Sequence, residues 1–316
     1  MEAIHDESLS ESDGDWSDLF DIIDPLSEEA VGEVTRSDQN RKRKSRDDEE
    51  DGTGLGVHMV ISREERQWAL ALKEAITNDN ETKEIPISDM EITQFAMVER
   101  GNVAKAVARI KLMHQFRIRH KIEESTEQGV ESVQAFMEQQ PGFLLNIDQC
   151  ARNKHYVQVM DFSKFYPARV HLDKDWTVFL SGMHYLMTSL HPTLAAVRHG
   201  IVGIVECEGM GWHNFCMDFE ARMWAEHPTV YPARWHEVSW VRPPTAANVF
   251  FSLLKPIMPA EIRNICHLGA QFDESYEGRL DGLFLQPSPE IAKQRQIRTV
   301  QSFLAKRYYN QAHFRL

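Results

Sequence analysis

The sequence has few cysteines and no long hydrophobic run. Its 316 residues include four cysteines, which are scattered and form no Cys-x-x-Cys pair. This spacing argues against a zinc site, and reduced cysteines in a cytosolic protein are the simplest interpretation. No apolar run approaches the roughly 20 residues that a membrane-spanning helix needs. The start, Met-Glu-Ala-Ile-His-Asp-Glu, lacks the positive and apolar regions of a signal peptide, so we expect none.

An excess of basic residues is also lacking. The chain has 48 acidic and 35 basic side chains and a formal net charge of -13. Residues 1–62 hold 18 of the acidic and 6 of the basic side chains, which leaves 30 and 29 for the remainder. The acidity therefore belongs to an N-terminal tail. The nearly neutral remainder argues against a dedicated nucleic-acid binder, which needs a basic face.

The residue combinations that enzymes use are not present together. Glu206 and Glu208 lie two apart on an expected strand and would face the same side, but no nucleophile, metal cluster or phosphate loop accompanies them. No serine lies in a Gly-x-Ser-x-Gly elbow. Among 14 histidines, His199 and His213 flank the same strand and are interpreted as structural. We therefore predict a protein that is not an enzyme, with no catalytic residue, cofactor or metal.

Residues 1–61 are predicted to be a disordered acidic tail, since they contain too few apolar residues to offset the entropy of ordering. Trp16, Leu19 and Phe20 lie among aspartates, a pattern typical of segments that fold on a protein partner; a transient cluster without a partner is the alternative. The cluster Arg41, Lys42, Arg43 and Lys44 is either a nuclear import signal or part of a solvated mixed-charge linker.

Residues 62–140 are predicted to form a small N-terminal helical lobe. Capping boxes begin at Ser62 and Ser88, each with Glu three residues later. Apolar residues recur at helical spacing in four segments, and Pro141-Gly142 ends the fourth. Packing explains these apolar stripes, and the lobe carries no catalytic constellation.

In residues 141–288 the spacing of apolar residues is no longer helical throughout, and strand-like segments appear. Tyr156–Met160 and 235–241 read as strands, and the continuous apolar run 201–205 suits a strand of a parallel sheet. Helical patterns alternate with these strands, which predicts an α/β fold. The helix 245–254 is apolar nearly all round, so it is either buried in the core or faces a lipid or ligand.

An ordered set of motifs in this region resembles the CRAL-TRIO lipid-binding family. The resemblance covers about residues 62–270. Its pieces are Tyr231-Pro232-Ala233-Arg234, the strand to Val241 with Pro243-Pro244, Phe250-Phe251, Leu254-Lys255-Pro256-Ile257-Met258 and Ile265-Cys266-His267-Leu268-Gly269. The strand 201–206 followed by Gly209 is similar to the family's central apolar strand.

The resemblance implies a mixed sheet flanked by helices, with a hydrophobic pocket of several hundred Å³ and a mobile gate helix that opens at a membrane. The pocket residues that it implies are Phe179, Met183, Met187, Ile204, Trp240, Phe250 and Phe251. The gate-helix residues are Val249, Phe250, Phe251, Leu253 and Leu254. Ordinary core packing remains the alternative for each of them.

The chain departs from the phosphatidylinositol-binding pattern of that family. Ala233 replaces the glutamate after Tyr-Pro, and Glu261 and Asn264 replace a threonine and a lysine. Met97 and Glu99 replace basic residues, although Arg100 remains. An inositol phosphate needs positive charge at fixed places. We therefore expect an apolar or different amphiphilic ligand.

Residues 289–316 carry six basic side chains and one acidic side chain, and their apolar residues have helical spacing. Such a helix can lie on an anionic membrane through Arg298, Lys306 and Arg307. Packing on the domain with a solvated basic face is the alternative, and contact with the acidic tail is a third.

The sequence thus predicts a protein that binds a lipid and transfers or presents it between membranes. We expect it to be cytoplasmic and peripherally membrane-associated, with transient membrane contact and no nucleic-acid partner. The alternative is a protein-interaction scaffold that keeps the fold without lipid transfer. A pocket filled by Phe179, Met183 and Met187 would favour the scaffold.

Overall fold

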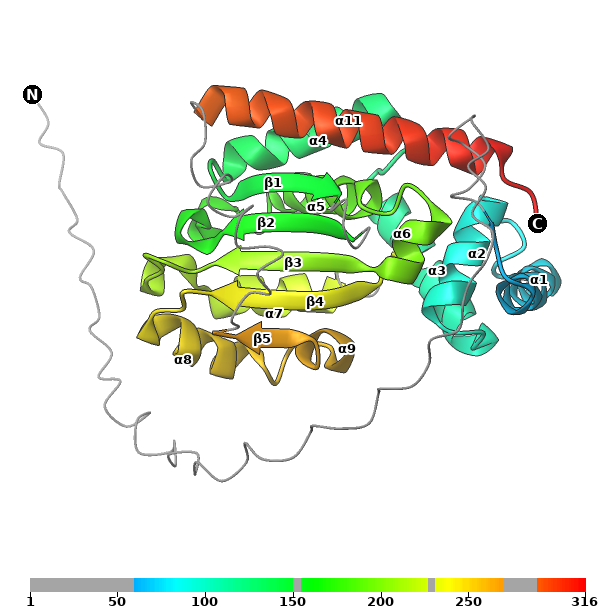
Figure 1. Ribbon diagram of the computed structural model, residues 1–316, viewed down its shortest axis with the longest axis horizontal. Helices are drawn as coiled ribbons and strands as arrows, with labels where there is room; N and C mark the ends of the chain where they lie inside the picture. Colours follow the sequence, from blue (N-terminus) through cyan, green and yellow to red (C-terminus); the bar gives the residue numbers. More distant parts are fainter. Residues whose placement is uncertain (1–59, 150–154, 227–230, 270–288) are drawn as a thin grey trace, which may run out of the picture. The chain divides into compact units, whose positions relative to one another are not determined.

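The computed structural model describes residues 60–149, 155–226, 231–269 and 289–316 (Figure 1). The predictions about residues 1–59, namely the tail, its apolar island and its basic cluster, lie outside the described residues. Residues Met1–Glu49 and Glu50–Leu316 separate into two units, and the fold below is that of the second.

Three N-terminal helices share one small core. They are α1 (Arg63–Asn78), α2 (Asp89–Val98) and α3 (Val103–Arg119). Both predicted capping boxes are confirmed: the Ser62 and Ser88 hydroxyls accept hydrogen bonds from the backbone N–H groups three residues later. The apolar stripes pack against one another, and the buried members are Ala69, Leu72, Ile76, Ile92, Phe95, Ala106, Ile110 and Met113.

The fourth helix, α4 (Thr126–Gln139), buries its apolar face in the main core of the body, which Phe116 of α3 also joins, and not in the small core of the first three helices. Its Val133 and Phe136 are fully buried against α5 (Trp176–Ser189), where the Phe136 side chain lies over Gly182. An amphipathic stripe shows that a helix buries one face but does not show which core receives it. The expected lobe of four helices therefore contains three.

A five-stranded sheet forms the centre of the body, in the order β1-β2-β3-β4-β5. The strands are β1 (Leu144–Gln149), β2 (Tyr156–Asp161), β3 (Ile201–Glu206), β4 (Trp235–Val241) and β5 (Cys266–Leu268). β1 is antiparallel to β2, and the other neighbours are parallel. The remaining helices are α6 (Leu194–His199), α7 (Met217–Glu226), α8 (Thr245–Leu254) and α9 (Ala260–Arg263), with short 3-10 turns at Phe162–Lys164, Pro167–Arg169 and Trp212–Asn214.

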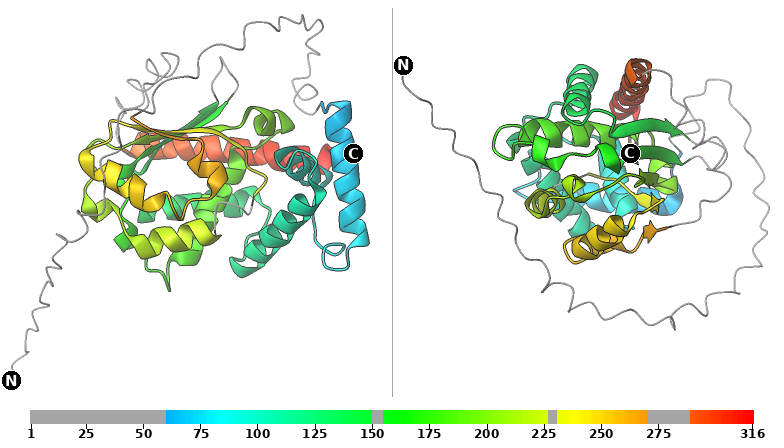
Figure 2. Two further views of the ribbon diagram at one scale, coloured as in Figure 1. Left: turned by 90° about the horizontal axis from the view of Figure 1, so that it is seen from below. Right: turned by 90° about the vertical axis from the view of Figure 1, so that its left-hand side faces the viewer.

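Helices α5, α7 and α8 lie on one face of the sheet (Figure 2). Successive strand residues point to opposite faces, so each central strand supplies two apolar surfaces. Tyr156, Met160 and Val205 pack with the helices in the main core. Val159 and Ile204 belong to a separate buried cluster on the other face. This division explains why β3 reads as a continuous apolar run.

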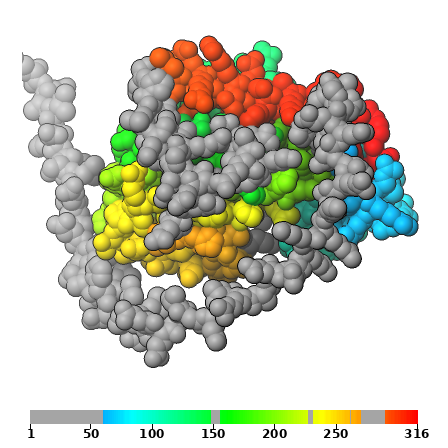
Figure 3. Space-filling view, viewed as in Figure 1, coloured from blue at the N-terminus to red at the C-terminus, as the bar shows by residue number. Residues whose placement is uncertain are grey.

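The last helix, α11 (Pro289–His313), packs along α4, α5 and β1 and reaches α2. Its C-terminal end adjoins the N-terminal helices (Figure 3), and the Leu316 N–H donates to an Asp89 carboxylate oxygen at 3.1 Å. Val300 and Leu304 are fully buried in the main core. This helix therefore joins the three N-terminal helices to the body. None of the described helices is both long and apolar enough to cross a bilayer.

The surface position predicted for Arg307 is wrong. Its side chain is 1% exposed and donates to the Gln94 side-chain oxygen at 3.2 Å and to the His191 carbonyl at 3.0 Å. Lys306 is half-buried, and burial lowers its pKa, whereas Arg298 is exposed. A helical stripe counted by charge alone cannot distinguish a solvated arginine from a buried one.

Candidate ligand cavity

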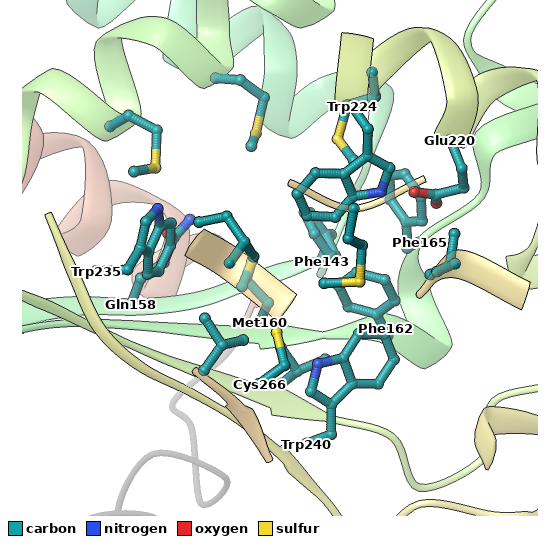
Figure 4. Close-up of a pocket in the computed structure, with 18 of the residues that line it drawn as sticks. Phe143, Gln158, Met160, Phe162, Phe165, Glu220, Trp224, Trp235, Trp240 and Cys266 are labelled. Carbon is teal, nitrogen blue, oxygen red and sulfur yellow. The ribbon is translucent and has the colours of Figure 1, made fainter. Parts of the chain in front are cut away.

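A cavity of about 130 Å³ lies between the sheet and the helices of its main-core face (Figure 4). Twenty residues from β2, β4, α5, α7 and their neighbours line it. They are Phe143, Gln158, Met160, Phe162, Phe165, Phe179, Met183, Met187, Val205, Glu220, Met223, Trp224, Tyr231, Trp235, Val238, Trp240, Leu254, Met258, Ile262 and Cys266.

The strand register forms one wall of the cavity. Met160 of β2 pairs with Val205 of β3, and Val205 pairs with Trp240 of β4. Side chains in register on neighbouring strands share a face, so these three lie in a row across the wall. Two residues earlier in β3 the wall has Gly203, where an added Cβ would lie 2.9 Å from the Trp235 ring. Glycine therefore leaves the space that this indole occupies.

Methionine and aromatic side chains make most of the lining. Three phenylalanines from the β1–β2 side contact one another, with ring centroids 4.9–5.3 Å apart among Phe143, Phe162 and Phe165. Five methionines complete the lining: Met160, Met183, Met187, Met223 and Met258. Methionine is unbranched and polarizable, so such a lining adapts to different apolar shapes.

Several polar side chains face this apolar space, among them Gln158, Glu220 and Trp240. Gln158 of β2 and Trp240 of β4 are 1% and 5% exposed, and neither Gln158 Nε2 nor Trp240 Nε1 has a hydrogen-bond partner among the described residues. Glu220 of α7 is 4% exposed. Burial raises the pKa of the Glu220 carboxyl to about 7, while the neighbouring Trp224 indole acts in the opposite direction. The described lining contains no basic side chain.

The structure brings together four of the seven predicted pocket residues. Phe179, Met183, Met187 and Trp240 line the cavity. Ile204 points to the other face of the sheet, and its neighbour Val205 takes the expected place. Whether any of them contacts a ligand stays a prediction.

Phe250 and Phe251 of α8 lie beside the cavity and not in its lining. Phe250 is buried and stacks on Phe215, with centroids 4.8 Å apart, while the Phe251 ring packs edge-on against Trp240 at 5.8 Å. The volume expected from the resemblance is also wrong, since several hundred Å³ was predicted and the cavity has about 130 Å³. Large side chains from the helices and the sheet fill the difference.

Sequence reasoning missed Gln158, Glu220 and the further methionines. Gln158 could have been identified from the sequence, because it is the single polar residue within the apolar stretch Tyr156–Met160 of β2. Glu220 could not have been identified in this way. It is one of three acidic residues on α7, and only the fold shows which of them is buried.

Helix α8, the predicted gate helix, has one buried face and one partly exposed face. Ala247, Phe250 and Leu254 are buried, and Leu254 lines the cavity. Val249 and Leu253 are partly exposed. The apolar composition therefore divides into a packed face and a face that is partly open.

Two of the five departures from the phosphatidylinositol-binding pattern, Glu99 and Ala233, line a separate groove of about 640 Å³ together with the retained Arg100. The Glu99 carboxylate pairs with Arg109 and lies 3.5 Å from the Lys105 ammonium. The described lining of this groove includes Arg100 and Arg234 as well, so it holds more basic than acidic side chains. Met97 is buried and Asn264 exposed.

Part of this chain matches the model of a known protein family. Residues 137–276 match the model of the CRAL/TRIO domain. Among solved structures, the crystal structure of Sfh5 matches with a TM-score of 0.42 and 13% identity, covering 70% of this chain and 84% of that chain. No curated protein matches the chain. Among the described residues no three His, Cys, Asp or Glu side chains are grouped as a metal site.

Proposed function

We propose that this chain, whose residues 137–276 match the CRAL/TRIO domain, binds a hydrophobic or amphiphilic lipid in the cavity without covalent chemistry, as expected of a member of the CRAL-TRIO lipid-binding family. The observation that supports this proposal is the cavity itself, which combines an apolar, methionine-rich lining with buried polar groups that have no hydrogen-bond partner within the described part of the chain. Ligand sites typically combine mostly apolar walls with a few polar groups that fix orientation.

The cavity must widen to hold a lipid. A dry cavity of about 150 Å³ accepts a molecule the size of benzene, whereas ligand sites usually have roughly 300–1,000 Å³. The five methionines supply one route, because they can adopt other rotamers. Movement of α8 supplies the other, and we propose that α8 is the gate.

Hydrogen exchange tests the gate. α5 buries 11 of its 14 residues and α8 buries three of ten, so α8 amides should exchange faster than α5 amides. Addition of phospholipid vesicles should change the amide exchange rates of α8 and leave those of α5 unchanged. Equal protection of the two helices, with and without vesicles, would refute a gate at α8.

Organic extraction of the purified full chain, followed by lipid mass spectrometry, tests the function. We expect one lipid class at near-stoichiometric amounts. Val205→Phe narrows the cavity at its sheet wall and should reduce bound lipid, whereas Val249→Phe on the partly exposed face of α8 should not. If the protein carries no lipid and takes none up from vesicles, the proposal is wrong. Stoichiometric phosphatidylinositol would instead overturn our preference against a phosphoinositide.

A scaffold without lipid transfer is the second candidate, and the small cavity favours it. Phe179, Met183 and Met187 line a cavity of about 130 Å³, which is smaller than a typical lipid site. If this candidate is right, the protein folds and binds a protein partner, but extraction of the purified chain yields no lipid. A vesicle-to-vesicle transfer assay separates the two, because only the first candidate predicts movement of lipid. Peripheral membrane contact and a cytoplasmic location follow from the first candidate and are tested by vesicle sedimentation and cell fractionation.

A further inference from the structure

Two hydrogen-bond donors on one sheet face point into the cavity. Gln158 lies on β2 and Trp240 on β4, with Met160 between them in Figure 4. Both side chains are at least nine-tenths buried, and neither Nε2 of Gln158 nor Nε1 of Trp240 has a partner among the described residues. Buried N–H groups in folded proteins are almost always paired. These two donors are therefore available to a ligand.

The charge of the lining limits what that ligand is. Glu220 is the acidic residue of the described lining, and Lys, Arg and His are absent from it. An anion in this space would find no countercharge and would share the cavity with a carboxyl group. Burial of an unpaired charge is among the costliest events in a protein interior. The lining thus disfavours free fatty acids and phosphate esters within the cavity.

We propose that the cavity selects neutral apolar ligands that carry a carbonyl-type acceptor oxygen, which receives a hydrogen bond from Trp240 or Gln158. This inference rests on the proposed function and names the ligand class. A hydrocarbon would bury both donors unpaired, and a carboxylate would bury an unpaired charge. A neutral ketone, aldehyde or ester pairs at least one donor and buries no charge, while its chain fills the methionine-lined space.

Matched ten-carbon probes test the inference. Binding of 2-decanone, decane and decanoate to the lipid-extracted full chain is measured by displacement of an apolar fluorescent dye. Trp240→Phe and Gln158→Leu remove one donor each and keep an apolar side chain of similar shape. At least one of them should weaken 2-decanone about threefold to tenfold, the range of a single hydrogen bond. Neither should weaken decane, since the cavity becomes more apolar. Decanoate should bind the wild type more weakly than 2-decanone.

The control is Met160→Leu, which changes the same wall without removing a donor and should affect 2-decanone and decane alike. Misfolding cannot imitate the expected result, because it would weaken both probes together. If both donor variants leave 2-decanone unchanged, or weaken decane equally, the inference is overturned while lipid binding stands. Tighter binding of decanoate than of 2-decanone also overturns it. If the wild type binds none of the probes, the proposed function falls as well.

Discussion

At the scale of single residues, the most constrained charge lies far from the cavity. Arg307 and Glu91 are each 1% exposed, and the Arg307 Nη2 lies 3.5 Å from a Glu91 carboxylate oxygen. Arg117 donates to the same oxygen at 2.7 Å. Three elements meet here, since Glu91 lies on α2, Arg117 on α3 and Arg307 on α11. Removing one member leaves a buried charge with fewer partners, which costs more than any surface pair contributes.

We expect Arg307→Met to lower the free energy of unfolding by about 3 kcal/mol, the lower end of the cost of breaking a buried ion pair, because Arg117 still contacts Glu91. Arg298→Met on the exposed side of α11 should change it by less than about 0.5 kcal/mol. Urea unfolding followed by circular dichroism measures both. If the two substitutions lower the free energy of unfolding equally, the buried ion pair contributes no more to stability than an exposed arginine does.

Glu220 predicts how stability depends on pH. Burial raises its pKa from 4.5 to about 7. Between these values the folded protein keeps a proton that the unfolded chain has released, so stability falls as pH rises through this window. Glu220→Gln removes the effect. The stability of this variant relative to the wild type should therefore increase from pH 5 to pH 8, by about 3 kcal/mol at most.

Glu226 on the same helix supplies the control for that series. Burial alone would raise its pKa, but hydrogen bonds from Trp176 and Arg222 outweigh burial and lower it. Its charged form is then favoured in the folded protein, and that contribution is complete above pH 4.5. Glu226→Gln should therefore differ from the wild type by a nearly constant amount above about pH 6.5, in urea titrations at each pH, whereas at lower pH it also loses the interaction with a protonated His120, 3.6 Å from this carboxylate. A flat difference for Glu220→Gln as well would contradict the buried neutral carboxyl.

The cavity shows where single-residue prediction from sequence ends. The apolar run of β3 indicates a strand buried on both faces, but composition does not show which of Ile204 and Val205 faces the ligand. The choice depends on register with Met160 and Trp240, which are 45 and 35 residues away in the chain. The predicted surface position of Arg307 was wrong for a related reason, because its partners Glu91 and His191 lie on elements that are distant in the sequence.

At the scale of elements, α4 and α5 pack closely against each other at Gly182. An added Cβ at Gly182 of α5 would lie 2.3 Å from the Phe136 Cβ and 2.9 Å from the Ser132 carbonyl oxygen of α4. Both distances are below those that real Cβ atoms show, and the second atom belongs to backbone, which cannot move alone. The helices therefore approach closely because position 182 has no side chain.

Gly182→Ala should destabilise the protein by about 1–3 kcal/mol, the usual cost of overpacking, although alanine is the better helix former. Thr177→Ala on the exposed face of the same helix tests propensity without this contact and should be neutral within about 0.5 kcal/mol. Thermal unfolding of both variants measures the difference. A stabilised Gly182→Ala would show that α4 and α5 can separate at no cost.

Elements with a strong local period were predictable. The helix over 176–190, the strands at 201 and 235 and the helix 245–254 all appear where the sequence places them. β1 was missed, because it pairs as an antiparallel edge strand with β2, and its residues Leu144–Gln149 alternate too briefly to give a signal. The partner of α4 was missed because Gly182, which admits it, lies more than 40 residues further along the chain.

At the scale of the whole molecule, α11 joins parts that the sequence presents as separate. It packs on α4, α5 and β1, and its Arg307 and Asn310 reach α2 and the loop before α6. Residues 289–316 therefore complete the core of the body and fix the three N-terminal helices to it. The basic composition that suggested a membrane-surface helix coexists with this packing, because Arg295 and Arg298 lie on its exposed face.

Two truncations of the chain separate these roles. A chain that ends at residue 288 loses the buried Val300, Leu304 and Arg307, so that Arg117 is the basic partner left to Glu91 among the described residues. We expect it to lose cooperative urea unfolding. A chain that begins at residue 50 keeps the whole second unit and should unfold at the wild-type midpoint. Circular dichroism and tryptophan fluorescence follow both transitions. If the chain ending at 288 unfolds cooperatively at the wild-type midpoint, α11 is an appendage and its basic face is free for another partner.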